Sequence, residues 1–320
     1  METKDGKKID FAVGGQAVIE GVMMRSNDFI TVAVRKESGG IELKDDPFKS
    51  ITKKIKVLGW PLVRGVVGLF EMMIVGMKAL NYSANVMIEE EEGIKREDKS
   101  KKAQFAEKLM FGFSFVFAIG LSLFLFKFLP LWITDWISGM YEPLRQSFYY
   151  NVIDGVLKTS FFIAYIAILT LMPSIRRVFE YHGAEHKSIY TYEKGLPLEV
   201  EHAKKQSRFH PRCGTSFILI VFMISILTYT MLPRDPDFLM HFARRLAFLP
   251  LIAGISYEFL KWSAKHTDNK FINWAIAPGL WFQKLTTKEP DDKQLEVALK
   301  ALDKALELEE ENKPSQAVVV

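Results

Sequence analysis

The sequence has little of several features that mark secreted or nucleic-acid-binding proteins. Its 320 residues include one cysteine, Cys213, so no disulfide can form within the chain and no oxidising compartment is implied. Residues 1–10 are charged and lack the apolar core of a signal peptide, so we expect no cleavable signal. The 42 basic and 38 acidic residues leave a net charge of only +4, which argues against nucleic acid as a partner.

Long windows of the chain also lack charge. Four windows are long and apolar enough to cross the hydrocarbon core of a bilayer: residues 109–133, 152–172, 213–232 and 246–262. This segregation is typical of an integral membrane protein and excludes a two-domain soluble enzyme. We therefore expect a mainly α, polytopic α-helical membrane protein with the lipid bilayer as a partner. Two spans would lie within residues 109–172 and two within 213–262.

Basic residues are distributed unevenly among the connecting segments. Lys and Arg number eleven in residues 1–57, six in 89–108 and eight in 173–212, but only one in 134–151 and three in 233–245. Because basic segments stay on the cytoplasmic side, both termini and the 173–212 loop should be cytoplasmic. The sequence therefore predicts a multi-pass protein of the cytoplasmic (inner) membrane.

Residues 58–88 fit a transmembrane span poorly. Four polar residues recur at seven-residue spacing in an otherwise apolar stretch: Arg64, Glu71, Lys78 and Asn85. This pattern favours a long amphipathic helix at the membrane interface, and it also fits a re-entrant hairpin whose polar stripe faces an internal site. Both alternatives stay open at this point.

The cytosolic N-terminal segment, residues 1–57, alternates apolar and polar side chains. This alternation, with turn-forming residues between the runs, predicts a small β-meander of three strands at residues 17–24, 29–36 and 41–44. So small a meander is not stable alone, and we expect it to dock on the rest of the molecule.

Composition assigns the remaining segments. Residues 89–108 form a charged cytosolic connector, and residues 263–290 carry an aromatic interfacial belt of Phe271, Trp274, Trp281 and Phe282. Residues 291–320 contain an amphipathic helix with leucines at heptad-like spacing: Leu295, Leu299, Leu302 and Leu306. This helix either packs on the body of the protein or binds a partner.

The 173–212 loop carries most of the residues that can perform chemistry. His182, Glu185 and His186 form an H-x-x-E-H pattern, which on a helix places the two imidazoles one turn apart on one face. Two histidine ligands of one metal ion need this spacing, and Glu185 could bind metal or act as a catalytic base. The alternative is a hydrogen-bonded interfacial pair of histidines.

His210 and Cys213 end the same loop at the start of the third span. Both ends of the loop return to the same membrane face, so either residue can approach the histidine pair as a third ligand of a divalent metal ion such as zinc. Arg208 and Arg212 flank them and could bind an anionic group of a substrate. A lone cysteine is also often a small apolar core residue.

For the other ionisable residues, a structural role is an alternative to a functional one or the simpler interpretation. Glu258, in the fourth span, is a functional candidate that could instead snorkel or pair with Lys261. Asp154 and Lys158 are four residues apart on the second span and most simply neutralise each other. Three histidines are expected to be bystanders: His202, His241 and His266.

Three motifs together resemble the YqhQ-like family of bacterial integral membrane proteins. They are GGQAVIEGVMMR at residues 14–25, YHGAEHK at residues 181–187 and RFHPRCGTS at residues 208–216. The resemblance extends to about residue 290. It implies a domain of unknown function that is labelled a predicted metal-dependent enzyme.

The resemblance adds three candidate site residues that composition does not raise: Gln16, Glu20 and Arg25. Glu20 would share a strand face with Gln16, and the docked meander would bring that face to the metal site. Glu20 would then join Glu185 as a catalytic residue, and Gln16 and Arg25 would join the two loop arginines in binding substrate. The alternative for Glu20 is a solvent-facing strand position.

Two functions from different classes fit these features. The first is a membrane-embedded metal-dependent enzyme at the cytosolic leaflet, with a hydrolase-like reaction on a lipid-linked or membrane-protein substrate. The second is a non-catalytic membrane protein whose metal site is structural, senses metal or handles ions. A transporter is disfavoured because few charges lie within the spans.

Overall fold

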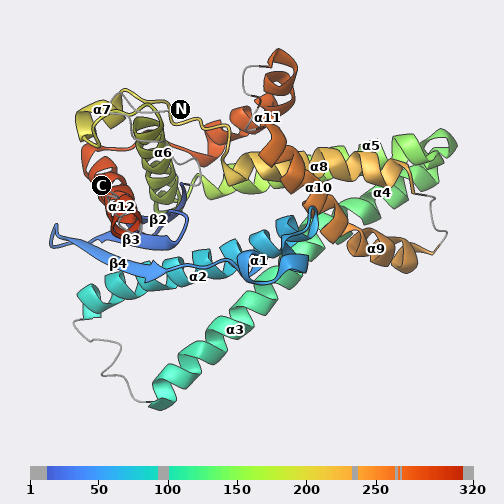
Figure 1. Ribbon diagram of the computed structural model, residues 1–320. Helices are drawn as coiled ribbons and strands as arrows, with labels where there is room; N and C mark the ends of the chain where they lie inside the picture. Colours follow the sequence, from blue (N-terminus) through green and yellow to red (C-terminus); the bar gives the residue numbers. More distant parts are fainter. Residues whose placement is uncertain (1–12, 93–100, 233–236, 264–265, 267–268, 313–320) are drawn as a thin grey trace.

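The fold is mainly helical, with one small antiparallel sheet at one end of the molecule (Figure 1). A computed structural model describes residues 13–92, 101–232, 237–263, 266 and 269–312. The sheet and the helices that cover it form one lobe, and the most apolar helices form a bundle beside it (Figure 1). The expected class, a helical protein with a small N-terminal meander, is confirmed.

The sheet contains four strands in the order β1-β2-β3-β4, namely β1 (Gly14–Val18), β2 (Gly21–Arg25), β3 (Phe29–Arg35) and β4 (Ile41–Pro47). The single strand predicted at residues 17–24 is wrong, because a two-residue turn at Ile19 and Glu20 divides it. Glu20 adopts a φ of 50°, in the left-handed region that reverses the chain. Gly21 then lies so close to strand β3 that an added Cβ would be 2.1 Å from the Ala33 carbonyl oxygen.

One face of the sheet is covered by a single long helix. The chain passes through α1 (Ile51–Lys54) and the 3₁₀ turn η1 (Lys56–Gly59) into α2 (Val63–Glu92). Buried apolar side chains join this face to α2: Val18, Met23, Ile30, Val32, Val34, Ala79 and Val86. Because α2 continues without a break, it is the predicted long amphipathic helix, and the re-entrant hairpin is excluded.

The opposite face of the sheet packs against α6 (Pro173–Glu193) and α12 (Asp292–Glu311), with α7 (Val200–Lys204) beside them. A capping box at Asp291 begins α12, and three of the predicted leucines, Leu295, Leu299 and Leu302, are buried in this core. The C-terminal helix therefore packs on the body of its own chain. The sheet is the middle of three layers.

The apolar bundle is built from α3 (Lys101–Leu123), the π-helical turn η3 (Phe124–Phe128), α4 (Leu129–Met140), the 3₁₀ turn η4 (Glu142–Arg145), α5 (Ser147–Leu169), α8 (Gly214–Thr230), α9 (Phe238–Ala247), α10 (Leu249–Ser263) and α11 (Lys270–Thr286). Three stretches of the described chain are long and apolar enough to span a membrane: Leu109–Met140, Ser147–Leu169 and Phe238–Ser263. The third predicted span, 213–232, is the shorter apolar helix α8. These helices indicate association with a membrane.

An ion pair and two glycines join α2 to the bundle. Arg64 donates two hydrogen bonds to Glu258 on α10, at 2.7 and 2.5 Å. Gly65 and Gly254 permit this approach, because an added Cβ would contact Tyr257 and the Leu62 backbone, respectively, at under 3 Å. Glu258, a functional candidate that could instead snorkel or pair with Lys261, is bonded to Arg64 of α2 in the structure.

The segment at residues 263–290, which contains α11, agrees only in part with the predicted aromatic belt. Trp274 and Trp281 on α11 are 71% and 69% exposed. Phe282 is instead buried and packs against the Phe162 ring at 5.3 Å. The side chain of Phe271 and the centre of the charged connector, residues 93–100, lie outside the described part of the structure.

Candidate functional site

Helix α6 positions the two histidines of the H-x-x-E-H motif as its spacing predicts. The His182 and His186 rings lie one turn apart, with 4.5 Å between their centroids. Gly183 between them is required by packing, since an added Cβ would lie 2.1 Å from the Lys288 carbonyl oxygen. The backbone that links α11 to α12 therefore crosses α6 directly beside the histidines.

Backbone carbonyls fix the orientation of both imidazoles. His182 Nδ1 lies 2.7 Å from the Thr286 carbonyl oxygen, and His186 Nδ1 lies 2.6 Å from that of Arg208. A carbonyl oxygen can only accept, so each Nδ1 carries the proton and donates it. Each Nε2 then carries a lone pair: that of His182 faces the Cys213 thiol, and the buried His186 Nε2 has no hydrogen-bond partner in the structure.

Cys213 completes this arrangement from the side of the helix bundle. It is the N-cap residue of α8, where its buried Sγ accepts a hydrogen bond from the Thr215 backbone N–H. His182 Nε2 lies 3.3 Å from Sγ, and one ligand atom each of His182, His186 and Cys213 lies within 4.8 Å of the other two. Two imidazole lone pairs and a thiol therefore converge on one point.

His210, the other predicted third ligand, is directed elsewhere. Its Nδ1 accepts a hydrogen bond from the Arg212 backbone N–H at 3.3 Å, and its Nε2 lies 3.3 Å from a Glu193 carboxylate oxygen. Both ring nitrogens are thus engaged outside the converging set. Burial lowers the pKa of His210 to about 4, partly opposed by the negative charge of Glu185, so the ring is neutral at neutral pH.

Glu185 faces the sheet from the same turn of α6. Its buried carboxylate accepts a hydrogen bond from the Gly15 backbone N–H of β1. Burial raises the pKa of Glu185, while the neighbouring His182 and His210 oppose the rise. Gly15 has no room for a side chain, because an added Cβ would be 2.9 Å from Glu185 Cγ. The meander therefore reaches the motif through a glycine of strand β1.

Glu20 does not share a strand face with Gln16, and that expectation is wrong. Because Glu20 lies in the β1–β2 turn, its carboxylate reaches α6 and accepts hydrogen bonds from Arg177 Nη2 at 2.7 Å and from the Tyr181 hydroxyl at 3.2 Å. Glu20 thus fastens the sheet to α6 about one turn before the histidines. It is neither solvent-facing nor a member of the converging set.

Gln16 and Arg25 lie on the far face of the sheet. The Gln16 side chain abuts Gly76 of α2, and Arg25 contacts the Met72 sulfur at 2.9 Å and the Phe48 ring at 4.2 Å. Burial lowers the pKa of Arg25. These two of the four residues predicted to bind substrate are therefore separated from the histidines by the sheet itself.

The two loop arginines, Arg208 and Arg212, bond other parts of the chain in this structure. Arg208 donates to the Thr287 carbonyl oxygen at 2.8 Å and lies over the Phe209 ring. Arg212 forms an ion pair with Glu193, and burial lowers the pKa of Arg212. Four residues that bond this segment in the folded chain were not identified from the sequence: Thr286, Thr287, Gln283 and Glu193. Gln283 bonds both the N–H and the carbonyl of His210, and nothing in its local pattern signals that contact.

The remaining histidines lie apart from the cluster. His202 is half-buried, with Nδ1 3.4 Å from Glu199. His241 is buried edge-on to the Tyr150 ring, and His266 is exposed beside Trp262. These positions agree with the expectation that all three are bystanders of the motif.

Comparison with known proteins shows the family of the chain. Residues 60–308 match the family model described as a protein of unknown function, DUF1385. The chain is 37% identical over 324 residues to the "Uncharacterized protein YqhQ" of Bacillus subtilis (strain 168), covering 98% of this chain and 99% of that protein. No solved structure matches the chain. The expected YqhQ-like membership is thereby confirmed, and the chain belongs to the DUF1385 family of proteins of unknown function.

Proposed function

We propose that the chain is a membrane-bound metalloprotein in which His182, His186 and Cys213 bind one divalent metal ion, zinc. The observation that carries this proposal is the buried, unpartnered Nε2 of His186, directed with His182 Nε2 at the Cys213 thiol. A buried nitrogen without a hydrogen bond is costly, and a metal ion would satisfy it. The carbonyls that hold each Nδ1 are the outer partners that metal-binding histidines usually have.

The donor set fits zinc and a catalytic role. Two neutral imidazoles and a thiolate suit a borderline-soft divalent ion. Among the described residues three ligand atoms converge, which would leave a fourth position for water or substrate, as in catalytic zinc sites. His182 is half-buried, so the cluster has a side that solvent or substrate could approach.

The adjacent Glu185 supplies an acid–base group. When bound, zinc would polarise a carbonyl or phosphoryl oxygen and lower the pKa of a water molecule. Burial raises the pKa of Glu185, which makes its carboxylate a stronger proton acceptor, and the Gly15 N–H holds its orientation. We therefore propose a hydrolase-like reaction with Glu185 as general base.

The position of the cluster supports a substrate at the bilayer surface. Cys213 begins the apolar helix α8, and Thr286 ends α11, so the site lies where the helix bundle meets the sheet lobe. A lipid-linked or membrane-protein substrate would reach such a site laterally. The basic residues of the 173–212 loop support a cytoplasmic position for this face, at the inner membrane.

Metal content tests the ligand assignment. Elemental analysis of purified protein should find one zinc per wild-type chain and none after His182→Ala, because two remaining ligands hold zinc weakly. His202→Ala is the matched control, since this histidine sits on the same lobe but outside the cluster, and it should keep its metal. Equal loss in both variants, or none in either, would overturn the assignment.

Glu185→Gln separates a catalytic site from a structural one. The amide keeps the shape of the side chain but cannot take a proton, so activity should fall by about 10²- to 10⁴-fold while metal content is retained. The measurement is complementation of a strain that lacks the gene, beside elemental analysis. Full complementation with full metal would exclude the catalytic role and favour a structural or ion-handling site.

Membrane orientation is open to a direct test. Reporters inserted within residues 189–206 or fused after Glu311 should report the cytoplasm, and one inserted within 138–147 should report the outside, because basic segments are retained inside. A cytoplasmic signal from the 138–147 insertion would contradict this orientation.

A further inference from the structure

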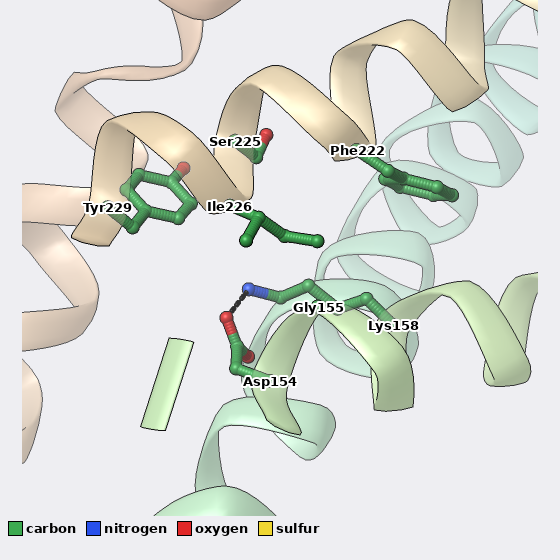
Figure 2. A pocket seen from close by; sticks show the side chains of 7 residues that line it. All are labelled: Asp154, Gly155, Lys158, Phe222, Ser225, Ile226 and Tyr229. Carbon is green, nitrogen blue, oxygen red and sulfur yellow. Dashed lines mark hydrogen bonds and ion pairs between the residues drawn. The ribbon is translucent and has the colours of Figure 1, made fainter. Parts of the chain in front are cut away.

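Charged residues inside the helix bundle bond mainly one another. Asp154 pairs with Lys158 at 2.5 Å, as expected, and also with Arg245, and all three are at most 5% exposed. The cavity beside them, between α5 and α8, has a volume of about 10 Å³, which is about the size of one water molecule (Figure 2). A larger ligand would therefore meet the charges at the surface of the protein instead.

An exposed segment that mixes apolar and basic side chains precedes α2. This segment, residues 49–63, contains α1 and η1 and has four lysines and no acidic residue. Its Trp60 is 60% exposed. The other exposed large apolar side chains of the segment are Ile51, Ile55, Val57, Leu62 and Val63.

Three of the four lysines carry charge that the described chain does not neutralise. Lys53 forms an ion pair with Asp28 at 3.1 Å. Lys49, Lys54 and Lys56 are exposed, and no acidic side chain in the described part of the chain pairs with them. The segment therefore presents unpaired positive charge next to exposed apolar side chains.

Contacts with α2 and α10 hold this segment against the bundle. Glu71 on α2 accepts hydrogen bonds from the Ser50 hydroxyl at 2.7 Å and from the Ile51 N–H at 2.5 Å. The Leu62 backbone packs on Gly254 of α10, where an added Cβ would lie 2.8 Å from the Leu62 carbonyl oxygen. The segment thus lies at the end of α2 that meets the apolar helices (Figure 1).

The exposed apolar surface continues from this segment along α2. Val63, Phe70 and Ile74 are exposed, and their spacing of seven and four residues places them on one face of the helix. Ala79 and Val86, on the opposite face by the same spacing, pack on the sheet. Exposed apolar side chains, a tryptophan and unpaired lysines beside apolar helices are typical of a segment that lies in the headgroup region of a bilayer.

We propose that residues 49–63 bind anionic phospholipids of the bilayer. Trp60 and its apolar neighbours would lie at the boundary between headgroups and acyl chains, and Lys49, Lys54 and Lys56 would contact the headgroup phosphates. A zwitterionic headgroup carries a compensating positive charge, so these lysines favour lipids with a net negative charge. The adjoining apolar helices favour a bilayer over an acidic protein surface, because one membrane would cover both. This binding is independent of the metal site.

Lipid binding to the purified full chain in detergent tests the proposal. The probes are phosphatidylglycerol and phosphatidylcholine with the same acyl chains, and native mass spectrometry measures the apparent affinity for each. The wild type should bind phosphatidylglycerol about tenfold more tightly or better, because each lysine near an anionic headgroup contributes attraction. In the triple variant K49Q/K54Q/K56Q, the preference should fall to about twofold or less.

The matched control removes three lysines from the sheet lobe. Lys205, Lys293 and Lys300 are also exposed, on or beside α7 and α12, so K205Q/K293Q/K300Q loses the same charge at a different surface. This variant should keep the wild-type preference. Equal losses in the two triple variants, or equal affinities of the wild type for the two lipids, would overturn the proposal.

Tryptophan fluorescence in vesicles provides a second measurement that does not depend on the lysine variants. The full chain is reconstituted in vesicles of phosphatidylglycerol with brominated acyl chains, which quench tryptophans that contact lipid. The emission that Trp60 contributes, taken as the difference between the wild type and Trp60→Phe, should be quenched. Unquenched Trp60 emission would mean that the segment faces water or a protein partner, and it would contradict the proposal.

Discussion

The backbone between α11 and α12 crosses α6 beside the histidines, and this crossing joins the candidate site to the core around α12. The Lys288 N–H donates to the Phe179 carbonyl oxygen at 2.8 Å. The carbonyl oxygen of Lys288 lies directly over Gly183. This crossing brings the Thr286 carbonyl to His182, and it starts α12 where it can bury its leucines against the sheet. A side chain at position 183 would push the two segments apart and disturb both the core and the site.

The three-layer lobe holds the site from more than one side. Helix α6 is held from the sheet side by Gly15 and Glu20, and from the bundle side by the loop that carries Arg208 and Cys213. Each imidazole is oriented by a backbone carbonyl, and backbone moves less than side chains do. Two lone pairs thus point at one position before any ligand is present, which reduces the cost of binding one.

Sequence periodicity predicted the elements that depend on local pattern. The H-x-x-E-H spacing placed His182 and His186 on one helix face, and the heptad-like leucines predicted that α12 is amphipathic, while leaving open what its apolar face packs against. Both inferences need only the geometry of one helix. For the same reason, the amphipathic stretch around Arg64 was recognised as unlike a span, although its partner Glu258 was not identified.

Predictions that needed exact register or long-range contact were wrong or incomplete. A turn at Glu20 divides one predicted strand, and in a strand a shift of one residue reverses the face of every side chain. Gln16 therefore faces α2 instead of the histidines. The choice between His210 and Cys213 depended on Glu193 and Gln283, whose contacts with the loop arise only in the folded chain.

X-ray absorption at the zinc edge on purified protein tests the proposed zinc site, because it reports the donor atoms themselves. We expect a coordination shell with two nitrogens of imidazole at about 2.0 Å and one sulfur at about 2.3 Å. The sulfur contribution should vanish in Cys213→Ser while the imidazole scattering remains. A coordination shell of nitrogen and oxygen without sulfur in the wild type, or protein purified with no stoichiometric metal, would contradict the proposed site.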